Sequence, residues 1–479
     1  MQVDLYAEKV DLCLLKALRH SREEGAMLTR IRTVGPFLWR HLSHQRRTGP
    51  VRVQLHSKRT SVMAGLTGCT LLLVLLAAAC VPVPASPAAP SQAPTATSAP
   101  AEAEPIFIGE INALTGVMST QGLPVHAGIQ YAIDEANAKG GINGRPIKLV
   151  TRDDESKPER ASAAAEELIS REGAIALIGG YVDTLVGPVS EVAEANQVPY
   201  LATASLDKRL VQRGYKYFFR MANLEGFAQA AAGAVTESFG ADNVAILHSV
   251  TPGATQTAER LQELLAEKGV EVSVVEKFTP GLSDFTPLLT KVRDANAQVL
   301  ISLGFTGDNV LMIRQLKEQN INVGGFIAMF GASLRAPVFK LGDAANYTSS
   351  TAIWNPALGL VTPGAEKISE EFARGFKEAT GKDAGGLTQH GYSAGLTLLA
   401  AMRNVAEAGK PITSQNIRDA LAEIDIPTPL ERVQFDPTGE PMHYEISVVQ
   451  IQGDDNVVIW PPEKATGKAI FPMPKWEER

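Results

Sequence analysis

Three consecutive acids, Asp153, Asp154 and Glu155, are the first candidates for chemistry in this chain of 479 residues. Carboxylates at the end of a strand can bind a divalent cation, which prefers oxygen ligands. Because no further ligand is spaced nearby, we expect a solvated turn with helix-capping acids and no metal site. We likewise interpret His248, which ends an apolar run, and His390, which begins a helix, as structural histidines rather than general bases.

Catalytic and phosphate-binding motifs are missing from the sequence. It has no G-x-x-x-x-G-K-[ST], no H-E-x-x-H and no G-x-G-x-x-G after a strand. It has no G-x-S-x-G elbow either, because Gly391-Tyr392-Ser393-Ala394-Gly395 lies inside a predicted helix rather than at a turn after a strand. We therefore predict no catalytic residues and no cofactor. An exported α/β enzyme stays open as an alternative.

A cysteine behind an apolar run indicates export. Residues 62–79 are uncharged, Lys58 and Arg59 precede them, and Ala77-Ala78-Ala79-Cys80 resembles a bacterial lipobox. We predict a signal peptide and lipidation at Cys80; the alternative is a transmembrane anchor. Either way, the residues after Cys80 face outward.

The residues before Cys80 and those after it differ in composition. For residues 1–79 we expect a wrongly assigned start codon followed by the signal peptide; the alternative is a cytosolic extension. Residues 80–105 contain seven prolines among Ala, Ser and Thr, which predicts a semi-rigid tether.

Charge and cysteine usage exclude further classes. The first 79 residues carry 12 Lys and Arg against 5 Asp and Glu, so the overall −7 leaves −14 for the rest. An acidic exported part disfavours nucleic acid as a partner. Of the three cysteines, only Cys80 lies in that part, so it has no disulfide and must bury a large core.

Strands and helices alternate with short loops, which is typical of doubly wound parallel sheets. We expect strands at 106–111, 146–156, 174–180, 198–205, 242–249, 270–278, 297–304, 323–330, 433–435 and 443–451. We expect helices at 124–141, 159–173, 186–197, 257–269, 285–296, 308–320 and 386–409. Two α/β lobes of similar size follow from this series, with ligand-accessible loops at the carboxyl ends of the strands.

Four segments carry a resemblance to a known family: IFIGEINALTG from Ile106, EANAKGGINGRPIKLVTRDDESKPERA from Glu135, ALIGG from Ala176, and DFTPLLTKVRDANAQVLI from Asp284. They resemble type I periplasmic binding proteins, in the branched-chain amino-acid (Leu/Ile/Val) and amide-binding branch of ABC importer receptors. The resemblance spans Ile106 to Val458. It implies a three-crossover hinge, with lobe 1 at 106–222 and 352–444 and lobe 2 at 223–351 and 445–470.

The resemblance also implies a ligand site between the lobes. In amino-acid binders of the family, a hydroxyl and backbone N–H groups hold the ligand carboxylate, and an acid with aromatic residues holds its ammonium. The matching positions here are Tyr181, Asp183, Thr184, Ala204, Ser205, Leu206, Phe305, Phe330 and Trp354.

Several of these positions depart from the family's pattern. Asp183 stands where amino-acid binders have Ser, Gly253 where they have Tyr, and Phe330 near their acid. We therefore expect a ligand other than a simple branched-chain amino acid: an apolar or aromatic compound, an amide, or a cation paired with Asp183. An equal alternative for Asp183 is the N-cap of a helix beginning near Leu185.

The resemblance implies further partners: an ABC permease with its ATPase, the membrane through the lipid anchor, and a monomeric receptor. A sensor that reports its ligand to a separate signalling partner is the remaining alternative.

Overall fold

The computed structural model describes residues 104–330 and 339–479. The predicted apolar segment 62–79, Cys80 and the tether up to residue 103 lie outside the described residues. Among the helices that are described, none combines the length and the apolar character needed to cross a membrane.

Five parallel strands form the first sheet, in the order β2-β1-β3-β4-β5. They are β1 (Ile106–Asn112), β2 (Ile147–Asp153), β3 (Leu177–Tyr181), β4 (Tyr200–Ala204) and β5 (Phe218–Arg220). β3 is buried at every position and β1 at all but one, because helices cover both faces of a parallel sheet. The first four strands confirm the sequence prediction; β5 was not foreseen.

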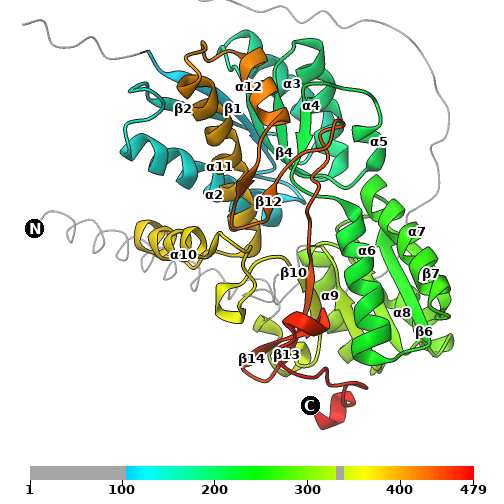
Figure 1. The fold of residues 1–479 in the computed structure, drawn as a ribbon. Helices are drawn as coiled ribbons and strands as arrows, with labels where there is room; N and C mark the ends of the chain where they lie inside the picture. The colour runs from blue at the N-terminus through cyan, green and yellow to red at the C-terminus, as the bar shows by residue number, and fades with distance from the viewer. Residues whose placement is uncertain (1–103, 331–338) are drawn as a thin grey trace, which may run out of the picture. The chain divides into compact units, whose positions relative to one another are not determined.

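The part of the chain built on this sheet is called lobe 1. Its helices are α2 (Ser119–Ala138), α3 (Pro158–Ser170), α4 (Asp183–Ala195), α5 (Lys208–Val211), α10 (Glu366–Thr380), α11 (Gly386–Glu407) and α12 (Ser414–Ala422). α3 packs beside α4, and α2 runs along α11 although 247 residues lie between them in sequence (Figure 1).

Glycines allow α2 and α11 to approach closely. A Cβ added to Gly128 of α2 would lie 1.9 Å from the carbonyl oxygen of Thr388, and one on Gly391 of α11 would lie 2.0 Å from that of Val125. Each helix thus has no side chain where the other's backbone passes. This contact fixes the start of α11 against the sheet of lobe 1.

The second sheet has seven strands in the order β14-β13-β10-β9-β8-β6-β7. They are β6 (Asn243–Ser249), β7 (Glu271–Phe278), β8 (Val299–Leu303), β9 (Gly325–Ala328), β10 (Ser349–Ala352), β13 (Ser447–Gln452) and β14 (Asp455–Trp460). The first five are parallel, whereas β13 and β14 form an antiparallel hairpin at the edge, beside β10. The fold is thus two α/β lobes built on parallel sheets, as predicted, with an antiparallel edge in the second.

The part built on this second sheet is called lobe 2. Its helices are α6 (Leu224–Gly233), continued by a π-helical segment (Ala234–Phe239), α7 (Pro252–Glu267), α8 (Thr286–Asp294) and α9 (Thr306–Glu318). A small hairpin of β11 (Ile426–Pro427) and β12 (Arg432–Val433) precedes β13, and short 3-10 turns complete the described chain at Phe339–Ala345, Pro356–Leu358, Pro462–Lys464 and Trp476–Glu478.

The chain passes between the lobes three times. It leaves lobe 1 after β5, returns between β10 and α10, and enters lobe 2 again before β13. The exact boundaries predicted from the sequence, 106–222 with 352–444 and 223–351 with 445–470, stay a proposal. The crossings bring Ala222, Trp354 and Tyr444 to the same region of the molecule, where the candidate site lies.

Candidate functional site

A cavity of about 140 Å³ lies where strand ends of both lobes meet the first residues of α7, α9 and α11. Its volume is close to that of a protein cavity that binds benzene, about 150 Å³. Residues from both lobes line it, so its shape depends on how the lobes meet. Small-molecule sites commonly occupy such a position, at the carboxyl ends of strands and between domains.

Seven of the nine ligand-binding residues predicted from the sequence line this cavity: Tyr181, Asp183, Ala204, Leu206, Phe305, Phe330 and Trp354. Ser205 is buried just behind the lining, and Thr184 is exposed to solvent. Gly253 is buried beside the cavity and contacts Asp183.

Asp183 is held by four donors. Its Oδ1 accepts hydrogen bonds from the Ser205 hydroxyl at 3.0 Å and from the backbone N–H groups of Leu206 and Asp207 at 2.6 and 2.8 Å. Its Oδ2 accepts from the N–H of Gly253 at 2.8 Å. The side chain is only 6% exposed, yet these bonds solvate its charge within the protein.

The interpretation of Asp183 as an N-cap is wrong. α4 begins at Asp183 itself, the N-cap position is Val182, and no side chain caps the helix. Val182 has φ 77° and ψ 141°, a conformation that costs a β-branched residue about 1–3 kcal/mol. This backbone turn directs the Asp183 side chain toward the loop after β4 instead of toward its own helix.

Hydrogen bonds across the lobes surround this carboxylate. Besides the Gly253 N–H, the side chain of Gln256 in α7 donates to Asp207 at 2.6 Å and accepts from the N–H of Lys208 at 2.9 Å. The start of α7 in lobe 2 is thereby bonded to the loop after β4 in lobe 1.

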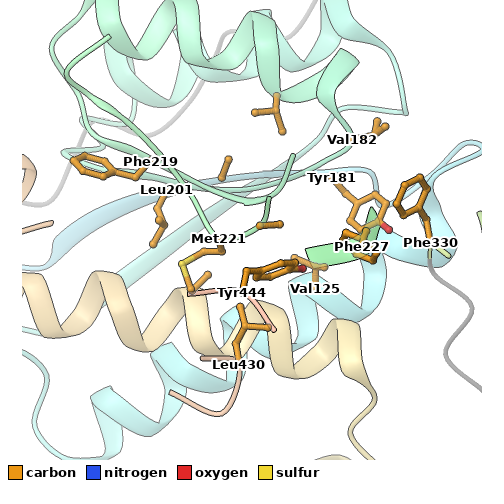
Figure 2. Close-up of a cluster of buried hydrophobic side chains, with 14 of the residues drawn as sticks. Val125, Tyr181, Val182, Leu201, Phe219, Met221, Phe227, Phe330, Leu430 and Tyr444 are labelled. Carbon is orange, nitrogen blue, oxygen red and sulfur yellow. The ribbon is translucent and has the colours of Figure 1, made fainter. Parts of the chain in front are cut away.

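Aromatic rings from both lobes form much of the lining. Tyr181 and Phe305 have ring centroids 6.1 Å apart, and Phe227 lies 5.1 Å from Phe330 and 5.9 Å from Tyr444. Figure 2 shows Tyr181, Phe227 and Phe330 grouped together, with Tyr444 approaching from the other side. Such rings favour a flat or branched apolar ligand.

Trp354 lies against the ring of Phe372, with centroids 5.6 Å apart, and is 6% exposed. Among the described residues its indole N–H has no hydrogen-bond partner. Trp354 thus packs on lobe 1 while one face of it contributes to the cavity lining.

The polar groups of the lining are almost all neutral. The hydroxyls of Tyr181 and Tyr444 have no hydrogen-bond partner in the described part of the chain, and burial raises the pKa of both. Burial lowers the pKa of His390 to about 4. Its Nε2 lies 3.2 Å from the carbonyl oxygen of Met221, so Nε2 carries the proton and Nδ1 is a free acceptor.

Asp183 is the only charged side chain among the described residues that line the cavity. No lysine or arginine in the described ranges lies there to receive an anion.

Sequence reasoning missed several lining residues, among them Ala222, Phe227, Thr251, Met329, Tyr444 and the 384–387 segment. His390 was predicted to be structural, and it also lines the cavity. A usable signal was present for 385–387, since Gly385 and Gly386 stand at the start of a long helix. Phe227 and Tyr444 gave none, because only the chain crossings bring them here.

Two α/β lobes joined by three crossings around a small cavity define a bilobal solute-binding protein. The sequence model of the periplasmic binding protein family matches residues 105–456, and the chain belongs to this family. This confirms the resemblance read from the sequence.

The named relatives have low sequence identity to this chain, but the match covers most of their length. An amino acid binding protein of Pseudomonas aeruginosa is 27% identical, over 70% of this chain and 87% of the relative. The leucine-, isoleucine-, valine-, threonine- and alanine-binding protein of the same organism is 24% identical, over 74% and 91%. A leucine-binding protein, LivK, from Thermotoga maritima shares the fold with a TM-score of 0.66 at 24% identity, over 74% of this chain and 97% of that one.

Proposed function

We propose that this protein is the extracytoplasmic solute-binding receptor of an ABC importer. One observation carries the proposal: a cavity of ligand size is lined from both lobes, and hydrogen bonds from the start of α7 join the lobes beside it. A ligand in this position bridges the lobes and stabilises their closed arrangement, which is what a permease distinguishes from the open one. The named relatives bind amino acids, which supports a small organic ligand.

The ligand contacts belong to the same proposal. Tyr181, Ala204, Leu206, Phe305, Phe330 and Trp354 supply apolar and aromatic contacts, and Asp183 organises the loop behind them. Thr184 and Ser205 have no direct ligand contact in this scheme. A family of binding proteins, together with neutral polar groups in the cavity, supports capture of the ligand rather than its conversion.

Calorimetric titration of the full chain, purified in detergent, tests the proposal. The panel contains leucine, isoleucine, valine, phenylalanine, benzoate, benzamide and short aliphatic amides. A receptor binds at least one of them reversibly at one site and returns it unchanged by mass spectrometry. Chemical conversion of a bound compound, or heat from none of them, contradicts the proposal.

Anchoring is a second, separate element of it. Family membership supports an extracytoplasmic location; lipidation at Cys80, the tether and the monomeric state rest on the sequence. Cys80→Ser expressed in a bacterial host should move the protein out of the lipid-labelled membrane fraction. Unchanged membrane retention would favour a transmembrane anchor.

A further inference from the structure

The geometry points to a function for Asp183: its carboxylate takes the hydrogen-bond donors beside the cavity that could otherwise bind the carboxylate of a ligand. We propose that the cavity therefore takes an uncharged ligand without a carboxylate, an apolar or aromatic molecule with a small polar head such as a carboxamide. The inference rests on the proposed receptor function and specifies its ligand class.

The donors around Asp183 are those that an external carboxylate needs. One hydroxyl and three backbone N–H groups converge within 2.6–3.0 Å of its oxygens. The N–H of Gly253 is at the start of α7, whose dipole favours an anion there. All four donors are used by the protein's own carboxylate, so none of them is left for a ligand.

A second carboxylate in the cavity would face repulsion that no positive charge of the described lining offsets. The described lining has no lysine or arginine, and His390 is neutral because burial lowers its pKa. Two carboxylates about 6 Å apart, at an effective dielectric constant of about 20, disfavour binding by roughly 100-fold.

The remaining polar groups suit a neutral head group. The Tyr181 and Tyr444 hydroxyls can donate and the His390 Nδ1 can accept, and none of the three has another partner among the described residues. A carboxamide or hydroxyl presents matching donors and acceptors to such groups. The aromatic rings of Phe227, Phe305 and Phe330 accommodate the rest of the molecule.

The first experiment asks whether Asp183 occupies an anion site. Formate and acetate are added to wild type and to Asp183→Ala, with chloride at equal ionic strength as the control. We expect formate to raise the Tm of Asp183→Ala by at least about 2 °C and to leave wild type unchanged. Asp154→Asn, which removes another buried carboxylate of lobe 1, is the matched control and should not respond. Equal responses of wild type and Asp183→Ala overturn the assignment.

The second experiment compares ligand pairs of equal shape. Benzoate and benzamide, and 4-methylpentanoate and 4-methylpentanamide, are titrated into wild type, Asp183→Ala and Asp183→Asn. Leucine and phenethylamine are titrated in the same way, as a zwitterion and a cation. Wild type should bind each amide about 100-fold more tightly than its acid. In both variants that ratio should fall to about 10-fold or less, and Asp183→Asn preserves the loop if Asp183→Ala is poorly folded.

The outcomes separate the two proposals. If wild type prefers the acids, or leucine over the amides, the ligand class is wrong and the receptor function stands. Tighter binding of phenethylamine than of the amides overturns the assignment of an uncharged ligand. The last outcome is that formate raises the Tm of Asp183→Ala while none of the titrated acids, amides, leucine or phenethylamine binds wild type or either variant. The assignment of Asp183 to an anion site is then supported, and the receptor function is contradicted.

Discussion

Gly253 should be unable to carry a side chain, because Asp183 occupies the space. A Cβ at this position would lie 2.5 Å from Oδ2 of Asp183 and 2.7 Å from Cβ of Leu206. The carboxylate is fixed by three donors of lobe 1, and Cβ of Leu206 cannot move without its backbone. In Gly253→Ala the start of α7 must therefore move away from lobe 1.

The size of the effect follows from the bond that is lost. An N–H donating to a charged acceptor contributes about 1.5–3 kcal/mol, so the population with parted lobes should rise by about 10- to 100-fold. The isolated lobes should be unaffected or slightly more stable, since Ala is favoured over Gly within a helix by about 1 kcal/mol.

Hydrogen exchange of the Lys208 amide measures this parting, because its N–H in lobe 1 donates to Gln256 of lobe 2. We expect the amide to exchange about 10- to 100-fold faster in Gly253→Ala. Gly307→Ala is the matched control: Gly307 is also the second residue of its helix, and a Cβ there meets nothing within 4 Å. Unchanged exchange at Lys208 in Gly253→Ala would refute the reasoning.

Three further predictions concern stability. Burial raises the pKa of Asp154 to about 6, with a smaller contribution from Asp153. The contribution of Asp154 to stability is therefore fully present below the unfolded pKa near 3.8 and is lost as pH rises through 6. Asp154→Asn should therefore be more stable than wild type at pH 8, by no more than about 3 kcal/mol, and equal to it below pH 4 in urea unfolding. The hydrogen bond to Glu110 raises the pKa of His126, so His126→Gln should destabilise the protein at pH 6 and have little effect at pH 9; equal losses at both pH values would contradict the pairing. Gly128→Ala should lower stability by about 1–3 kcal/mol, because its Cβ would meet the Thr388 carbonyl; an unchanged urea midpoint would show that α2 and α11 can separate at little cost.

The sequence was sufficient for the fold because its elements are local and regular. Apolar runs such as Leu177–Tyr181 are buried on both faces, and periodic helices such as α8 begin and end near their predicted residues. β5 escaped prediction because it has only three residues. The strand predicted at 443–451 overlaps β13, but its antiparallel direction was not predicted, since the direction depends on which neighbour the strand pairs with.

The site was only partly predictable, for a different reason. Residues in the loops after β3 and β4 could be found because parallel strands end at one edge of a sheet. Phe227 and Tyr444 reach the cavity through chain crossings, and no local pattern marks them. The role of Asp183 could not be predicted either. An aspartate near the start of a helix can cap that helix or can accept hydrogen bonds from another loop, and only the backbone conformation of Val182 distinguishes the two.

Asp183 and Gly253 are best understood as one feature divided between the lobes. The sequence suggested two separate departures from the family's pattern, an acid where a small hydroxyl is usual and a glycine where a tyrosine is usual. In the structure the acid accepts a hydrogen bond from the N–H of that glycine, in the space that a larger residue at 253 would need. A hydroxyl at 183 leaves room for an external carboxylate, which a carboxylate at 183 excludes. It also removes one of the two contacts that a side chain at 253 would meet, and the other, with Cβ of Leu206, requires the start of α7 to shift. Restoring an amino-acid site should therefore require changes in both lobes: Asp183→Ser alone frees the anion donors, and Gly253→Tyr alone clashes with Asp183. If the double variant binds leucine more tightly than the product of the two single effects predicts, the two positions act as a unit.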